Sequence, residues 1–521
     1  MLSVVTSRHS CVRRIQIAAG VAALLAGALG GTRVQAQEIP GGALTSSSLF
    51  AGFSPLERRA ALIGQATYNE LDALCGGGQP SPLCAGGVLD VYENVRELVE
   101  TAQEIITGQD TFYGLNLDAE GLGFALRWTA AEELLAQGSS AKDFANSQTS
   151  TLGNRISAIR AVSRAGLYAR NRVSELVKYG YASNAPIPAS NAGAGFSRLS
   201  AFFDVSNGYG NKADTTFNGV SSFGNEDAFD FDGYEYTLGL DWRFNDSLVV
   251  GGLLGYTDRY VDFDSTKSIV DGYIKSKGFS LTGFLQYDQL HYYASLSLGY
   301  QQLGFDTYRV ISYPSFDSRI DSTNTATAGD PDSKALLATA NFGLPFQWGP
   351  VGADLYLAGN YQKMKIDAFA EREVAIAGGN GSGFQFNVAS QNIKSLDGVV
   401  GGKLSYVWTP GFGVVMPYVR TEYHRQLQTA RTKIYLNFAA LPDDIAGSIQ
   451  DLVGPALLSD KPDNAYLTYS LGFSMVIRGS SDVDASGRGS GGLQGYLQYT
   501  TVEGLRNYRS KLITGGLRYE F

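Results

Sequence analysis

The strongest constraint in this sequence is a two-residue alternation of apolar and polar side chains that fills its C-terminal two thirds. In the stretch YEYTLGLDWRF, which covers residues 234–244, aromatic and aliphatic residues alternate with Glu235, Thr237, Gly239, Asp241 and Arg243. The stretch AYLTYSLGFSMVI, residues 465–477, alternates in the same way. Because successive side chains of a β-strand point to opposite faces, this period predicts strands with one apolar face.

We predict twelve such strands. They lie near residues 196–208, 234–244, 247–263, 272–287, 290–304, 334–347, 351–365, 391–408, 412–428, 465–477, 491–502 and 506–521. Many contain about ten residues or more, the length that crosses a bilayer at a steep tilt.

The connectors between these strands alternate between short and long. Tight turns are expected near residues 245, 288, 348 and 409, and most of the intervening connectors are long and rich in Asp, Asn, Gly and Ser. The stretch 479–492 breaks this rule, because it is long where a short turn is expected. Short turns on one side and long loops on the other are typical of an outer-membrane barrel. A soluble antiparallel barrel or sandwich is the alternative, since its strands also alternate between apolar and polar side chains.

Composition supports a chain whose strands face lipid. Charged residues make up 17% of the chain, against about 25% in ordinary globular domains, and 63 of the 521 residues are glycine. The net charge of −9 argues against nucleic acid as a partner.

The first 36 residues have the layout of a secretory signal peptide. Three arginines precede an apolar run over 15–31, and small residues follow at 34–36, which predicts cleavage between Ala36 and Gln37. An uncleaved membrane anchor is the alternative, but the run is short for a span. The sequence thus predicts an exported chain.

Residues 56–180 have a helical period instead, and a Pro/Gly/Ser/Asn-rich linker over 181–195 separates them from the strands. This region contains Cys75 and Cys84, which close a short loop around Gly and Pro. In an oxidising compartment the pair predicts a disulfide. A metal site is disfavoured because the loop contains no His and no acid, and the sequence indicates no cofactor.

The region from about residue 149 to the end resembles the translocator domain of the autotransporters of Gram-negative bacteria, which belong to type V secretion. The stretches that carry the resemblance are LGNRISAIRA at 152–161, the glycine-rich hairpin around Gly239 and Asp241, the strand with Pro417 and His424, and the terminal Phe521. The resemblance implies an all-β transmembrane barrel of 12 antiparallel strands with a helix in its lumen, here preceded by a small all-α region. We therefore expect a signal peptide at 1–36, a helical passenger-like region at 37–150, a linker and pore helix at 151–190 and the barrel at 191–521.

Three sets of residues follow from this interpretation. The basic pore helix contains Arg155, Arg160, Arg164 and Arg170; the side chains expected to face the lumen are Asp204, Glu235, Asp241, Asp354, Glu422 and His424; and the C-terminal assembly signal comprises Leu517, Tyr519 and Phe521. A cationic helix in a partly anionic lumen would gain electrostatic complementarity, although arginines on a solvated helix face are the alternative. His424 is expected to be a hydrogen-bonded structural residue rather than a site.

The exported region offers no recognisable catalytic constellation, so we predict that the protein is not an enzyme. The only histidines after residue 36 are His291 and His424, both on predicted strands, and 37–190 contain no nucleophile-elbow motif. Some relatives cleave their own linker at paired asparagines, but Asn154 stands alone here, so cleavage is not expected.

Two functions are compatible with these observations. In the first, the barrel inserts in the bacterial outer membrane and displays the helical region at the cell surface, with membrane lipid, the outer-membrane assembly machinery and an unidentified surface ligand as partners. In the second, the barrel is a structural or porin-like protein and the helical region is a plug or a periplasmic element.

Overall fold

The computed structural model describes residues 42–77, 81–154, 199–212, 228–245, 247–263, 270–408, 414–428, 430–460, 463–478, 482–483, 489–490, 492–506 and 508–521. All of them belong to one compact unit, Ile39–Phe521. The predicted signal peptide, with its cleavage site at Ala36 and Gln37, lies outside these residues, as do the four arginines of the predicted pore helix.

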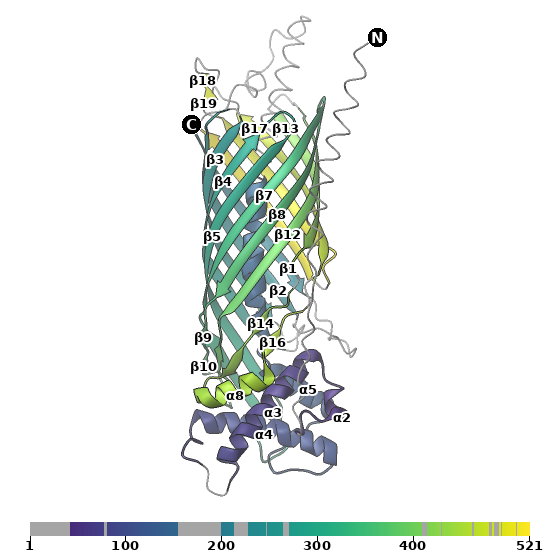
Figure 1. The fold of residues 1–521 in the computed structure, drawn as a ribbon, viewed down its shortest axis with the longest axis vertical. Coiled ribbons are helices and arrows are strands. Elements are labelled where there is room, and N and C mark those ends of the chain that lie inside the picture. Colours follow the sequence, from purple (N-terminus) through teal and green to yellow (C-terminus); the bar gives the residue numbers. More distant parts are fainter. Residues whose placement is uncertain are drawn as a thin grey trace, which may run out of the picture. The chain divides into compact units, whose positions relative to one another are not determined.

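Twelve long antiparallel strands form a closed barrel in the described part of the chain (Figure 1). They are β1 (Leu199–Lys212), β2 (Phe229–Arg243), β3 (Leu248–Phe263), β4 (Gly272–Asp288), β5 (Tyr293–Tyr313), β7 (Asp332–Trp348), β8 (Val351–Ile366), β12 (Gln391–Tyr406), β13 (Val414–Gln426), β17 (Ala465–Arg478), β20 (Leu493–Glu503) and β21 (Tyr508–Glu520). Each predicted strand corresponds to one of these, so the sequence prediction of a 12-stranded barrel is confirmed.

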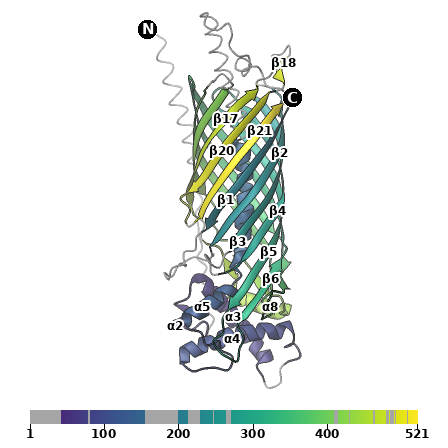
Figure 2. The same cartoon turned by 180° about the vertical axis from the view of Figure 1, so that it is seen from behind.

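The first and last strands close the barrel. β1 pairs with β21 from Ser200 and Glu520 at one end to Lys212 and Tyr508 at the other, and the two lie side by side in Figure 2. The backbone N–H of Phe521 donates to the carbonyl of Leu199 at 3.1 Å. Closure removes both sheet edges, which would otherwise expose unpaired backbone groups.

The alternation along each strand separates the outer wall from the lumen. On β2, Tyr234, Tyr236, Leu238 and Leu240 are exposed, whereas Glu235 and Asp241 are buried. A large apolar outer surface and a polar interior are the inverse of a soluble domain, and they suit a wall that faces lipid.

The connectors differ at the two ends of the barrel. At the end where Phe521 lies, β7 and β8 are joined through Gly349 and Pro350 alone, whereas the connector between β17 and β20 is long and contains the small hairpin β18 (Asp482–Val483) and β19 (Gly489–Ser490). At the opposite end the connectors are themselves folded. They contain β6 (Thr323–Gly329), β9 (Phe369–Ala370), β10 (Arg372–Val374), β11 (Phe386–Val388), β14 (Lys433–Ile434), β15 (Leu436–Phe438), α8 (Asp443–Val453) and β16 (Leu457–Leu458).

Helices precede the barrel. They are α2 (Ser47–Phe50), α3 (Pro55–Cys75), α4 (Gly87–Thr107), α5 (Ala119–Thr129), the 3₁₀ turn η1 (Glu132–Leu134) and a helix over residues 135–154, beyond which the description stops. α3 starts with a reciprocal cap between Ser54 and Glu57, and Pro55 occupies its first position. α4 is followed by its capping residue Gly108, which has φ 68°, a conformation that suits glycine. Among the described helices, none combines the length and the apolar character that a membrane crossing requires.

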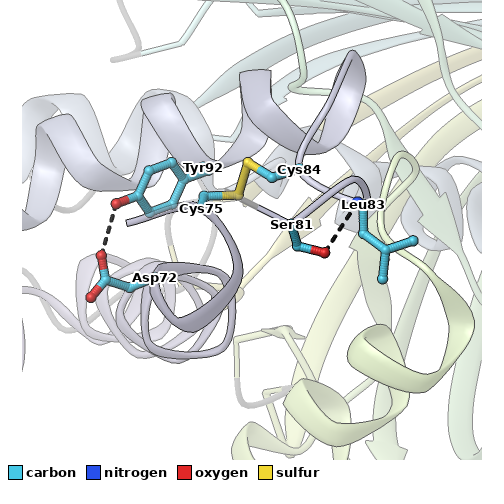
Figure 3. The surroundings of a disulfide bond; sticks show 6 residues. All are labelled: Asp72, Cys75, Ser81, Leu83, Cys84 and Tyr92. Carbon is cyan, nitrogen blue, oxygen red and sulfur yellow. Dashed lines mark hydrogen bonds between the residues drawn. A yellow bond between two sulfur atoms is a disulfide. The ribbon is translucent and has the colours of Figure 1, made fainter. Parts of the chain in front are cut away.

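The predicted disulfide between Cys75 and Cys84 is present and joins the end of α3 to the loop before α4 (Figure 3). Nearby, the Tyr92 hydroxyl of α4 donates to Asp72 Oδ1 of α3 at 2.8 Å. Closing so short a loop stabilises the folded state by about 2–3 kcal/mol in the chain-entropy account. The two links hold α3 and α4 as one hairpin.

Candidate functional site

The candidate site is the lumen of the barrel, and the helix over residues 135–154 lies inside it (Figure 1). The hydroxyls of Ser140 and Ser276 on β4 are 2.9 Å apart. Gln362 Nε2 on β8 donates to Asn146 Oδ1 at 2.6 Å. Gln148 Nε2 donates to the Thr237 hydroxyl on β2 at 3.3 Å, with both groups buried. Contacts to strands on different sides of the wall show that the helix passes through the interior rather than along the surface.

Two arginines of the barrel wall hold this helix electrostatically. Arg259 Nη2 on β3 lies 3.3 Å from Asp143 Oδ2, which also accepts a hydrogen bond from the Tyr508 hydroxyl. Arg420 Nη1 on β13 donates to Asn154 Oδ1 at 2.8 Å. Here the wall supplies the cations and the helix supplies the acceptors.

This described helix differs from the predicted pore helix in position and charge. Residues 135–154 contain one lysine and one aspartate as their only charged residues, whereas the predicted basic stretch with Arg155, Arg160, Arg164 and Arg170 follows it and lies outside the described residues. The lumen helix therefore begins before residue 151. The signal that could have located this helix is the high content of small and amide side chains over 137–151, interrupted only by Lys142, Asp143 and Phe144, which suits a helix surrounded by polar wall residues.

Four of the side chains expected to face the lumen line a single cavity of about 340 Å³ beside the helix. They are Glu235, Asp354, Glu422 and His424. Glu422 accepts hydrogen bonds from the Tyr356 hydroxyl at 2.6 Å and from the Thr468 hydroxyl at 2.9 Å. His424 stacks on the Tyr466 ring, with centroids 4.5 Å apart, which suits a structural role.

The other two, Asp204 and Asp241, lie closer to the end of the barrel that carries Phe521 and are not among the residues that line this cavity. Arg518 Nη2 donates to Asp241 Oδ1 at 2.9 Å, and Arg518 also pairs with Glu520. Arg518 is a lumen residue that the sequence interpretation omitted, although its even position in the last strand places it opposite the exposed Leu517 and Tyr519.

At the opposite end the lumen changes from polar to apolar. Inward residues of β2, β3, β4, β5, β7 and β8 form what we call the apolar mouth: Phe229, Phe231, Val261, Phe263, Ile274, Leu303, Phe305, Ile311, Ala335, Leu337, Met364 and Ile366. They share one buried cluster with Leu98 and Val99 of α4 and Leu122 of α5. The helical region thus completes its hydrophobic core with the barrel wall.

Hydrogen bonds between the helical region and the folded connectors hold the helical region at this end. Asn94 Nδ2 of α4 donates to the carbonyl of Ser382 at 2.6 Å. Arg59 Nη1 of α3 donates to the carbonyl of Val453, the last residue of α8, at 3.2 Å. Arg319 Nη2 donates to the carbonyl of Thr111 at 2.8 Å.

A buried ion pair organises one of these connectors. Arg309 on β5 donates through Nε and Nη2 to the two carboxylate oxygens of Glu371, at 3.0 and 2.9 Å, and to the carbonyl of Phe384 at 2.9 Å. A bidentate pair of this kind is geometrically specific. It fixes the connector between β8 and β12 against the mouth.

Comparison with known proteins identifies the barrel. Residues 205–452 match the family model of the autotransporter beta-domain. The barrel is an autotransporter β-domain. Proteins with this domain reside in the outer membrane, so the outer wall of the autotransporter barrel contacts membrane lipid.

Three solved structures similar to this autotransporter are translocator units. The translocator domain of NalP from Neisseria meningitidis is 14% identical, and the match covers 70% of this chain and 98% of that one with a TM-score of 0.43. The beta domain of BrkA from Bordetella is 13% identical, with 62% and 99% covered and a TM-score of 0.37. The transport unit of AIDA-I from Escherichia coli is 10% identical, with 62% and 90% covered and a TM-score of 0.33. A search of the curated proteins finds no match.

Proposed function

We propose that this autotransporter displays its helical region on the cell surface as a permanently docked cap. The observation that carries the proposal is the position of that region. It contacts the folded connectors at the end of the barrel opposite Phe521, and the helix over 135–154 leads from it into the lumen. The resemblance implies that the last strand ends at the periplasmic interface, which puts the helical region outside the cell.

The extent of the contact supports permanent attachment. The apolar mouth and the helices share one core, and burial of a core residue contributes about 1.5–3 kcal/mol for a large aliphatic or aromatic side chain. A region released after export would leave that cluster open to water. The single Asn154, hydrogen-bonded to Arg420, also differs from the paired asparagines at which relatives cleave.

The role of the cap in this proposal is binding or shielding rather than catalysis. The family match concerns a transport domain. Residues 37–154 contain no histidine, and the described residues contain no cluster of His, Cys, Asp and Glu that could hold a metal ion. A surface ligand would meet the outward faces of α3, α4 and α5.

Protease accessibility on intact cells tests the display. An epitope tag inserted near Gly77, between α3 and α4, should be digested by protease added to intact cells. A matched tag in the connector over 479–492 should be protected until the outer membrane is permeabilised. If the first tag were protected and the second digested, the orientation would be the opposite one, and the result would favour the alternative in which the helical region is a plug or a periplasmic element.

A further inference from the structure

The outer wall of the barrel carries an unusual group of lysines on three neighbouring strands. We call Lys334 of β7, Lys363 and Lys365 of β8 and Lys394 of β12 the lysine cluster; all four are exposed and occupy outward positions. The register places Lys334 directly opposite Lys365, and Lys363 directly opposite Lys394. Like charges at directly opposed positions repel each other across a sheet.

The acids around the cluster compensate only part of this charge. Lys365 Nζ lies 2.9 Å from Asp367 Oδ1. Among the described residues, no ion pair or hydrogen bond involves the ammonium group of Lys363 or of Lys394. At least these two cations face outward without a partner from the described part of the chain.

The wall beneath the cluster is apolar. On β8 the outward residues below Lys363 are Val351, Ala353, Leu355, Leu357, Gly359 and Tyr361. On β12 they are Leu396, Gly398, Val400, Gly402, Leu404 and Tyr406. No charged side chain interrupts either series, so the cluster marks the point where the apolar band of the wall ends.

The height of this point matches a lipid headgroup. Lys394 is twelve residues from Tyr406, which lies at the Phe521 end of β12. At about 3.3 Å per residue and a tilt of roughly 40°, the lysine is about 30 Å above that end. The apolar band of such barrels is about 25 Å tall, so the ammonium groups are just beyond it.

We propose that the lysine cluster binds the phosphate groups of an anionic lipid in the leaflet nearest the helical region. The acyl chains of the lipid would lie on the apolar wall of β7, β8 and β12, and its phosphates would meet Lys363 and Lys394. Basic clusters at a membrane surface attract anionic headgroups, at about 1 kcal/mol for each Lys or Arg. The proposal rests on the barrel being in a membrane and on the proposed display of the helical region, which makes the leaflet nearest that region the outer one.

Native mass spectrometry of the full chain in detergent micelles tests this proposal, with phosphorylated lipid A as the probe. The double substitution Lys363→Gln and Lys394→Gln should weaken binding on the order of tenfold. The charge-conserving pair Lys363→Arg and Lys394→Arg should retain it. Raising the salt concentration should weaken binding to the unmodified chain, because exposed charges are screened.

The matched control is the pair Lys275→Gln and Lys277→Gln on β4, where Lys277 already pairs with Asp258 at 3.1 Å. Binding should change less than twofold in this variant. The proposal is overturned if the two glutamine pairs reduce binding equally, if Lys363→Gln with Lys394→Gln binds as the unmodified chain does, or if dephosphorylated lipid A binds as tightly as the phosphorylated form. Heat-modifiable migration in gels establishes that each variant is folded.

Discussion

Gly383 shows how closely a barrel connector approaches the helical region. Its φ is +83°, and a Cβ atom built there would lie 2.9 Å from Asp90 Cβ and 3.0 Å from the Val91 backbone nitrogen, both on α4. Gly378 in the same connector has φ +71°, but nothing lies within 4 Å of its Cβ position. Substitutions at the two glycines therefore distinguish the effect of backbone strain, which both share, from the effect of contact with α4, which only Gly383 makes.

We expect Gly383→Ala to destabilise the docked helical region by about 2–4 kcal/mol, because it adds a clash with α4 to the left-handed strain. Gly378→Ala should cost about 1 kcal/mol, which is the strain alone. Thermal unfolding of the full chain in micelles, followed by circular dichroism at the helical band, measures the difference. Equal effects of the two substitutions would show that α4 does not contact this connector.

Glu97 on α4 makes the helical region sensitive to pH. Burial, followed by repulsion from Glu93, raises the pKa of Glu97 to about 8. The folded state therefore binds a proton more tightly than the unfolded state, in which the pKa of a glutamate is near 4.5. The stabilisation from this group is fully present below the unfolded pKa and is lost as the pH rises toward 8.

Glu97→Gln should flatten the decline in stability between about pH 5 and pH 8 and stabilise the helical region by about 1–3 kcal/mol at pH 8. Denaturant unfolding at a series of pH values measures this slope. The exposed Glu120→Gln, which removes a carboxylate from the same helical region, serves as the control. An unchanged slope in Glu97→Gln would contradict the assignment.

At the scale of elements, the strands could be predicted and the connectors could not. A barrel strand follows from the period of its own side chains, so even β20 and β21 were located within two or three residues. The connector between β8 and β12 contains Glu371 and Phe384, which bind Arg309 from 62 and 75 residues further along the chain. No local sequence pattern reveals such a distant partner. A polar connector is therefore predicted to be an irregular loop, even where it is folded.

The lumen, too, could be predicted only in part. The two-residue period was sufficient to place Glu235 and Glu422 inside, but it did not show that Phe231 and Phe263, inward on the same strands as polar residues, form a shared core with α4 and α5. The start of the lumen helix was also missed. Asn146 and Gln148 face partners on barrel strands that are distant in the sequence, so the helix has no apolar face that its own sequence could reveal.

The seam between β1 and β21 predicts a role for the last residue. Phe521 has an exposed side chain, and its backbone bonds to Leu199. Deleting Phe521 should lower outer-membrane assembly severalfold and leave signal cleavage intact, because the seam loses its terminal hydrogen bond and the predicted assembly signal loses its aromatic end. Phe521→Tyr should assemble normally. The heat-modifiable fraction in membrane extracts provides the measurement, and normal assembly of the deletion would argue against this role.

At the scale of the whole molecule, the lumen helix should block the pore. A chain that lacks residues 42–178 should show raised conductance in planar bilayers, because both the cap and the helix over 135–154 are removed. A chain that lacks only residues 42–130 retains the helix and its contacts with Arg259 and Arg420, so its conductance should stay low. Equal conductance of the two deletions would mean that the helix does not fill the lumen.

The core shared by the helices and the apolar mouth also determines when the helical region can fold. Somewhat less than half of the buried residues in that core belong to the barrel wall and its connectors, so the helical region alone cannot complete the core. In the proposed display, the helical segment would lack this part of its interior during export and would remain incompletely folded until it reaches the apolar mouth. Under the same proposal, packing of the exported helices against the barrel wall would oppose their return through the lumen.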